Sequence, residues 1–237
     1  MIVELTGAPG VGKTTIFERL RADMGGDAVF FSRDVALARI GLAGIPGRWL
    51  RIAATDTMFI FIGLANTRGA LAFIRQVVGA VLSTQEPLRV KLNILRNTLL
   101  KIGRHHFIWR YLADRLVVID EGLSHVPFNI ADYTCNRVPD PAEVLSPIED
   151  LTRQLNVALI DNSGANLATT LALRGHSRLN SSASYGPERF AAVCRVLAER
   201  YRAMPTGMFA TFRVFDLAKP EAYNCVISYL RHTEAAQ

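Results

Sequence analysis

The sequence of 237 residues has few cysteines, and none are arranged as a disulfide or zinc framework. Cys135, Cys194 and Cys225 are widely spaced and form no CxxC pair, which is typical of a protein in a reducing compartment. The first residues also lack the basic start and small-residue cleavage site of a secretory signal. We therefore expect a cytoplasmic protein.

Long hydrophobic runs are absent as well. The most apolar stretch, 58–73, is interrupted or flanked by Asp56, Arg68 and Arg75, so no window reaches the roughly 20 uncharged residues of a spanning helix. We expect a helix pair there and no transmembrane segment. Neither GxGxxG nor HExxH occurs, which argues against a Rossmann dinucleotide site and a directly bound catalytic metal.

Negative charge is scarce in one internal segment. Between Val35 and Arg115 the chain has twelve Arg or Lys against three acids, whereas its overall net charge is only +6. Such asymmetry indicates an anionic partner facing this segment, although a solvated helical face would have the same composition. The aromatic residues interleaved with these charges fall on apolar stretches, so we expect helix packing and no specific nucleic-acid binding.

Apolar runs suited to buried strands alternate with helical patterns along the chain. Strands are expected at 2–5, 28–31, 116–119, 157–160 and 209–215, and helices at 14–24, 141–155, 165–173, 187–204 and 220–230. The basic segment reads as mostly helical, with breaks at 44–47 and near Pro87. This alternation predicts an α/β protein with a parallel sheet, whose ligands bind beyond the carboxyl ends of the strands.

The stretch 7–14, Gly-Ala-Pro-Gly-Val-Gly-Lys-Thr, matches the phosphate-binding pattern G-x-x-x-x-G-K-[ST] at every fixed position. An apolar run precedes it and an amphipathic pattern follows it, as this motif requires. Lys13 is expected to act on the β- and γ-phosphates, and the Thr14 hydroxyl to bind Mg²⁺. The predicted nucleotide-binding residues are Gly7, Ala8, Pro9, Gly10, Val11, Gly12, Lys13, Thr14 and Thr15.

Two acids follow the third predicted strand. Asp120 has the position of a Walker B carboxylate and is predicted to hold Mg²⁺ opposite Thr14. Glu121 is predicted to orient or deprotonate a nucleophile, either water or an acceptor hydroxyl. Each could also be an ordinary strand-end acid.

Three further residues are candidates for the chemistry. Asp34, after the second strand, could accept a proton from an acceptor hydroxyl while the neighbouring Arg33 holds an acceptor phosphate, or it could only cap a helix. Arg174 and Arg178 flank Gly175 and suit a lid that closes on the transferred phosphate, or a solvated helix end. Asp161, after the fourth strand, is read as a cap or turn residue.

The order of these parts resembles the P-loop kinases of the nucleoside monophosphate kinase superfamily, which includes thymidylate kinase. The similarity covers 1–34 and 115–237, and 215–220 is similar to the segment that packs against adenine in that family. Where the family commonly has Asp-Arg and an aromatic residue, this chain has Asp-Glu-Gly at 120–122. The resemblance implies a three-layer α/β/α P-loop NTPase fold with a five-stranded parallel sheet, and ATP with Mg²⁺ as phosphoryl donor.

The leading hypothesis is therefore an ATP-dependent kinase. Residues 1–34 and 115–237 would form its core, and 35–114 a basic helical insertion between the second and third strands, covering a small anionic acceptor. The alternative is an ATPase or GTPase switch with a macromolecular partner, in which Glu121 activates water. A third hypothesis is a nucleotide-gated module that docks on a membrane surface or nucleic acid through the insertion. Homodimer formation and the identity of the acceptor stay open.

Overall fold

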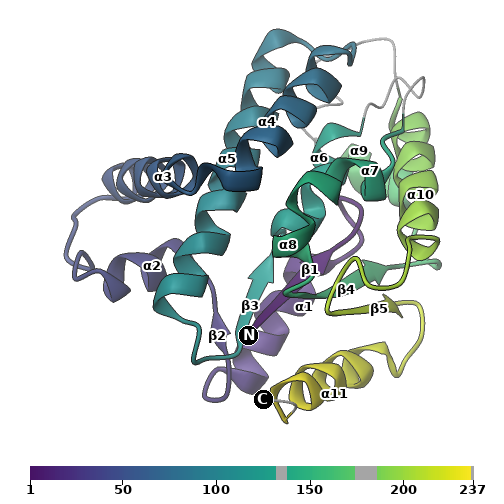
Figure 1. Cartoon of the computed structure of the whole chain (residues 1–237). Coiled ribbons are helices and arrows are strands. Elements are labelled where there is room, and N and C mark those ends of the chain that lie inside the picture. Colours follow the sequence, from purple (N-terminus) through teal and green to yellow (C-terminus); the bar gives the residue numbers. More distant parts are fainter. Residues whose placement is uncertain (132–137, 174–185, 236–237) are drawn as a thin grey trace.

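A five-stranded, all-parallel sheet lies at the centre of the protein (Figure 1). The computed structural model describes residues 1–131, 138–173 and 186–235. The strands, in the sheet order β2-β3-β1-β4-β5, are β1 (Ile2–Thr6), β2 (Val29–Phe30), β3 (Val117–Asp120), β4 (Leu155–Asp161) and β5 (Thr211–Asp216). The central strands consist mainly of buried apolar residues, as expected for a sheet covered on both faces. The predicted α/β class is confirmed, and so are its five parallel strands.

Helices cover both faces of this sheet. On one face α1 (Lys13–Met24) contacts β1 and β3, and α11 (Ala222–Ala235) contacts β5. These two helices are joined where the Tyr223 hydroxyl donates to the Asp23 carboxylate. On the other face lie η1 (Leu123–His125), α6 (Val126–Ile130) and α10 (Pro187–Arg202). Side chains alternate along β1, so they face the two helical layers in turn. Glu4 and Thr6 face η1, while Val3 and Leu5 point to the opposite side of the sheet.

Between β2 and β3 the chain forms a helical lobe, which we define as α2 to α5 (Figure 1). Its helices are α2 (Arg33–Arg39), α3 (Arg48–Ala65), α4 (Thr67–Leu82) and α5 (Leu88–Tyr111). The predicted breaks at 44–47 and near Pro87 are confirmed, as is the helix pair expected over 58–73, which divides at Asn66. Among the described helices, none is both long and apolar enough to cross a bilayer.

The long helix α5 crosses α3 with almost no space between the two backbones. A Cβ atom on Gly103 would lie 1.8 Å from the backbone oxygen of Phe59, and one on Gly63 would lie 3.2 Å from that of Leu99. Only glycine permits so close an approach. This contact fixes the position of α5 relative to the rest of the helical lobe.

Three sequence predictions of elements are corrected. The helix expected at 141–155 is three short pieces, α7 (Pro141–Leu145), η2 (Ser146–Ile148) and α8 (Glu149–Thr152), and Leu155 already belongs to β4. Pro147 breaks the pattern, since proline cannot donate the hydrogen bond that a continuous helix needs. The last strand begins at Thr211 and not at Phe209, and the helix expected at 165–173 is α9 (Leu167–Leu173).

Candidate functional site

The phosphate-binding motif forms a loop between β1 and α1. Gly7, Gly10 and Gly12 have φ angles of 140°, 88° and 105°, which other residues adopt rarely. The loop is also packed tightly, because a Cβ on Gly7 would lie 2.2 Å from the Ile160 backbone oxygen. The motif glycines are thus required by backbone conformation and by close approach. Their left-handed turns aim the N–H groups of the loop toward its centre.

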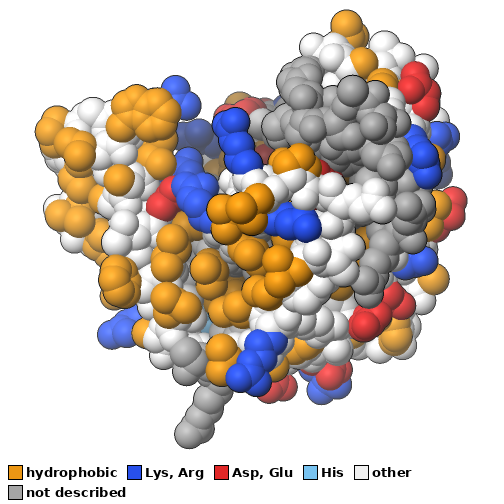
Figure 2. Space-filling model, turned by 90° about the horizontal axis from the view of Figure 1, so that it is seen from above, with side chains coloured by type: hydrophobic (Ala, Val, Ile, Leu, Met, Phe, Trp, Pro, Cys, Tyr) orange, Lys and Arg blue, Asp and Glu red, His pale blue; other side chains and the backbone are white. Residues whose placement is uncertain are grey.

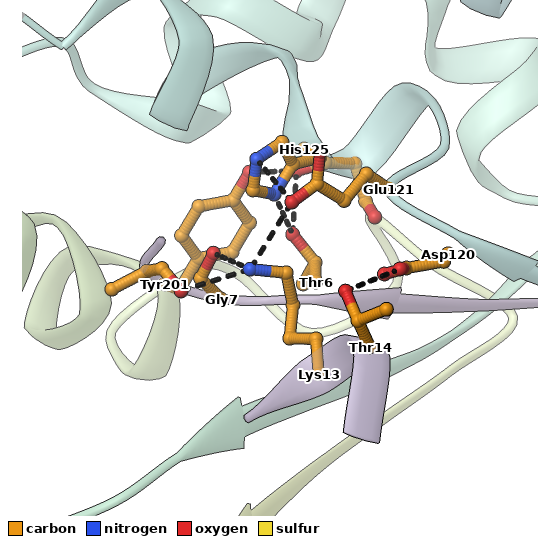
Figure 3. A network of polar contacts seen from close by, with 10 residues as sticks. Thr6, Gly7, Lys13, Thr14, Asp120, Glu121, His125 and Tyr201 are labelled. Carbon is orange, nitrogen blue, oxygen red and sulfur yellow. Dashed lines mark hydrogen bonds and ion pairs between the residues drawn. The ribbon is translucent and has the colours of Figure 1, made fainter. Parts of the chain in front are cut away.

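Lys13 occupies the inside of this loop (Figure 3). Its side chain is 4% exposed, and its Nζ donates to the backbone oxygens of Gly7 at 2.9 Å and Ala8 at 2.8 Å. The carboxylate of Glu121 lies 3.3 Å from the same ammonium. A phosphate placed in the loop would meet this ammonium directly. The sequence prediction for Lys13 is consistent with this position.

Thr14 and Asp120 meet at the edge of the loop. The Thr14 hydroxyl donates to Asp120 Oδ2 at 3.0 Å, whereas Asp120 Oδ1 is buried and has no partner among the described residues (Figure 3). Burial raises the pKa of Asp120, and the neighbouring Glu121 charge raises it further. A hydroxyl beside a carboxylate with a spare oxygen fits Mg²⁺, which prefers oxygen ligands and would offset the buried charge. Thr15, the next residue, is exposed.

Glu121 follows directly in the left-handed region, with φ of 61°. Its carboxylate lies between Lys13 Nζ and His125 Nε2, at 3.3 and 3.4 Å. The His125 imidazole, followed by Lys13 and Lys101, holds the pKa of Glu121 well below its usual range, despite burial, so the side chain stays ionised. In this arrangement Glu121 is an acceptor of hydrogen bonds that orients its neighbours.

Sequence reasoning missed the residues that support Glu121. His125 is buried, stacks on Phe128 and contacts the Thr6 hydroxyl at 3.4 Å. The buried Glu4 carboxylate accepts hydrogen bonds from the N–H groups of Leu123 and Ser124, which fixes the start of η1. The only signal in the sequence was the spacing of four between Glu121 and His125, which suits two residues on one helical turn.

A small cavity of about 160 Å³ adjoins these carboxylates. It lies between β3 and α5, and its wall includes Asp120, Glu121, Lys101 and Arg104. Lys101 is 6% exposed, and burial lowers its pKa to about 8. The sequence had counted Lys101 only among the twelve cations of the basic segment. Its position among the buried residues of α5, such as Ile94 and Thr98, at spacings of three and four, was the signal that could have distinguished it.

A larger pocket of about 490 Å³ lies on the far side of Arg104. Four arginines line this pocket, which we call the arginine pocket: Arg33, Arg48, Arg51 and Arg104. The Nε atoms of Arg33 and Arg51 are buried without a hydrogen-bond partner among the described residues. In Figure 2, Lys and Arg side chains gather near the centre of the face, beside the hydrophobic surface of the helical lobe. The pocket is therefore suited to an anionic ligand.

Asp34 has a different position from the one expected. It is an exposed residue in the first turn of α2, whose N-cap is Ser32, and it forms an ion pair with Arg51 in the arginine pocket. It does not line the cavity beside Asp120. The chain turns into α2 soon after the short β2, and this turn places Asp34 beside Arg51 in the arginine pocket. The alternative that Asp34 caps the helix is wrong, because Ser32 is the N-cap and Asp34 lies in the first turn.

Segments after β4 and β5 complete the surroundings of the loop. The side chains of Leu167 and Thr170 in α9 lie beside Gly10, and that of Leu217 lies beside Gly12. Leu217 belongs to 215–220, the segment expected to pack against adenine. Asp161 at the end of β4 forms an ion pair with Arg202 and accepts from the Asn162 N–H, as expected of a turn residue. Arg174 and Arg178 lie outside the described residues, so their role as a lid stays a prediction.

The described residues contain no group of three His, Cys, Asp or Glu side chains that could bind a metal ion by themselves. A cation at Thr14 and Asp120 would therefore take other ligands from its surroundings, as Mg²⁺ does when it binds with a nucleotide. Neither a protein-family model nor a curated protein matches this chain significantly, so the geometry of the site is the basis for a functional assignment.

Proposed function

We propose that the chain is an ATP-dependent phosphotransferase with a P-loop kinase fold, acting on a small anionic acceptor. The observation that carries this proposal is the pair of contacts at the loop, Lys13 within it and Thr14 on Asp120. Residues 1–34 and 115–237 would form the kinase core. The helical lobe would correspond to the insertion at 35–114 that covers the acceptor.

Each part of the site has a role in this proposal. The loop N–H groups and Lys13 bind the phosphates of ATP, and Leu217 offers an apolar contact beside the loop. Thr14 and Asp120 would hold Mg²⁺, which neutralises phosphate charge when bound. An acceptor oxygen forms a bond to the γ-phosphorus as the bond to the β–γ bridging oxygen breaks. The electron pair of that bond leaves with ADP.

The arginine pocket supports an anionic acceptor. Its lining carries four guanidinium groups against one carboxylate, Asp34. Arg104 lines both this pocket and the cavity beside Asp120, so the two spaces adjoin at this side chain. Arg33, a predicted holder of an acceptor phosphate, also lines the pocket, although it contacts Asp56 at 3.5 Å.

The test is to replace Lys13 and follow nucleotide binding and turnover. Lys13→Ala should lower phosphoryl transfer by about a hundredfold or more, because a positioned charge at the transferred phosphate is lost. The matched control is Lys91→Ala, since Lys91 lies on α5 and its Nζ donates to the Leu82 carbonyl. Calorimetry with MgATP and circular dichroism should be measured for both variants. Unchanged MgATP binding and turnover in Lys13→Ala would contradict the proposal.

A switch NTPase is the second candidate, favoured by the Glu121 carboxylate beside Lys13. The two functions differ in the fate of the γ-phosphate. A kinase should hydrolyse ATP slowly until an acceptor is supplied, and a panel of anionic sugars, nucleotides and alcohols should include one that stimulates ADP release. In a switch, Glu121→Gln would abolish hydrolysis that no small acceptor stimulates. Stimulation only by a macromolecule would favour the switch.

A further inference from the structure

Three polar side chains of α5 face the end of β3 across the small cavity. Asn97, Lys101 and Arg104 all line it, and their spacing of four and three places them on one side of the helix. Asp120 and Glu121 form the facing wall. These two carboxylates contact Thr14 and Lys13, so they separate the cavity from the phosphate loop. The cavity thus lies next to the residues that contact the loop, on the side of the helical lobe.

Among the described Lys and Arg side chains of the helical lobe, Lys101 differs from the others because its charged Nζ is buried without a hydrogen bond. Its side chain is almost fully enclosed, and its Nζ has no hydrogen-bond partner among the described residues. By contrast, Arg96, one turn earlier on the same helix, is paired with Asp56 and exposed. A buried, unpaired ammonium is unfavourable for the folded state, and an apolar side chain of similar length would be tolerated better. Such a group is typical of a site that binds an anion.

Neither carboxylate of the cavity accepts a hydrogen bond from Lys101, and the unpartnered Asp120 Oδ1 is the oxygen assigned above to Mg²⁺. Glu121 is already held between Lys13 and His125, and Asp120 Oδ2 accepts from Thr14. Glu121 nevertheless neighbours both lysines. It contacts Lys13 at 3.3 Å and lines the same cavity as Lys101, where its charge partly offsets the lowering of the Lys101 pKa by burial. A group that replaces Glu121 as the neighbour of Lys13 would come within reach of both ammonium groups.

We propose that Lys101 and Arg104 bind the γ-phosphate of the nucleotide from the side opposite Lys13, which makes Lys101 a catalytic residue. This inference rests on the proposed function, because it requires a nucleoside triphosphate in the phosphate loop. Arg104 also borders the arginine pocket, so it would contact the transferred group and the acceptor at their junction. The helical lobe would in this way supply positive charge to the reaction as well as covering the acceptor.

The test compares nucleotides with and without a γ-phosphate. Calorimetry should be carried out on the full chain with Mg²⁺ and either ADP or adenosine 5′-(β,γ-imido)triphosphate. Lys101→Met should bind MgADP within about twofold of the original chain and lose at least about tenfold in affinity for the imido-triphosphate, the effect of removing a charged hydrogen bond. Lys101→Arg should recover part of this loss. Lys91→Met is the matched control, since it removes the other lysine of α5, and should change neither affinity.

Thermal stability provides a second readout that separates binding from structure. Because Lys101 Nζ has no hydrogen-bond partner in the described part of the chain, Lys101→Met should raise the melting temperature by about 2–4 °C, whereas removal of a structural ion pair would lower it. If the Met variant does not fold, Lys101→Gln tests the same point. Equal loss of both nucleotides, no loss of either, or an original chain without preference for the triphosphate would overturn the role of Lys101. An original chain that binds neither nucleotide would instead refute the proposed function, and the inference with it.

Discussion

Glu121 adopts a left-handed backbone conformation directly after β3, and this turn directs its carboxylate back to Lys13 and His125. Non-glycine residues with such φ values carry strain that the surrounding contacts must offset. Here the offset comes from the ion pair with Lys13, from the contact with His125 and from the Glu121 N–H, which donates to the Leu5 backbone oxygen at 3.1 Å. The strained residue is therefore part of the support of the phosphate loop.

His105 gives the fold a defined sensitivity to acid. Burial lowers its pKa from 6.5 to about 3, so the folded protein keeps the imidazole neutral while the unfolded chain is protonated below pH 6.5. The folded pKa is the lower one, so the stability contributed by neutral His105 is complete above pH 6.5 and is lost as pH falls toward 3. We expect the free energy of unfolding to decline by up to about 1.4 kcal/mol per pH unit in this window.

The measurement is urea unfolding between pH 7 and pH 4. His105→Leu should flatten the decline, although His106, whose pKa is also lowered by burial, will keep part of it. His232→Gln is the matched control, because His232 is exposed on α11 and should not change the slope. A decline that is the same in all three proteins would contradict this role of His105.

Local patterns predicted only part of the site. Lys13, Thr14 and Asp120 were found because the phosphate-binding motif and a strand-end acid are properties of short segments. Lys101 was treated as equivalent to Arg96, and only the fold distinguishes them, since one side chain is enclosed and the other is paired and exposed. The contact of Thr6 with His125 joins positions 119 residues apart, and no local pattern indicates such a contact.

The crossing of α3 and α5 positions the cations of the small cavity. Gly103 stands between Lys101 and Arg104, and its Cα approaches the backbone of Phe59 too closely for any side chain. Gly103→Ala should therefore force the helices apart, destabilise the protein by about 1–3 kcal/mol and weaken binding of the triphosphate. Gly79→Ala on α4 is the matched control, because a Cβ there meets nothing within 4 Å.

Urea unfolding of the two glycine variants checks this prediction. Gly79→Ala should be neutral or stabilise by up to about 1 kcal/mol, since alanine favours the helix. A Gly103→Ala variant as stable as the original chain would mean that α5 can shift without cost. The position of Lys101 would then not depend on the crossing.

Element boundaries were predicted well where glycine or proline marks a break in the sequence. They were predicted poorly where tertiary packing sets the end of a helix or strand. The glycines at 44 and 47 and Pro87 mark breaks that the structure has. The pattern at 141–155 predicted one helix, but the helix is broken at Pro147, and the parallel pairing of Leu155 with Ile2 makes the last residue of that range the start of β4. Asn66, where α3 gives way to α4, carries no strong turn signal.

The whole chain divides its charge between the basic helical lobe and a remainder that is acidic on balance. The sheet places the ends of β1 and β3 side by side, and α5 returns the helical lobe to that edge. A ligand in the phosphate loop should therefore affect both the sheet and the helical lobe. The sequence predicted the charge asymmetry, but which of the cations reach the loop depends on the path of α5.

Hydrogen exchange followed by mass spectrometry should display this coupling. Addition of Mg²⁺ with the imido-triphosphate should slow exchange in 7–14, around Asp120 and in the middle of α5, because all three would border the bound phosphates. Exchange in α4, which lines neither the loop nor the small cavity, is the internal reference and should not change. Protection confined to 7–14 would indicate that the helical lobe does not contact the nucleotide.

The segment Lys-Ile-Gly-Arg at 101–104 has a consequence for recognising homologous proteins. A phosphate-binding motif is shared by very many unrelated families, so alone it identifies no close relation. Here one turn of α5 combines two cations with the glycine that the crossing requires. Chains that share this ancestry and this site should have small residues at the positions corresponding to 63 and 103. They should also have cations at the positions corresponding to 101 and 104, and Asp-Glu-Gly at the end of the third strand. That combined fingerprint, more than the loop itself, would separate true homologues from the large background of nucleotide-binding proteins.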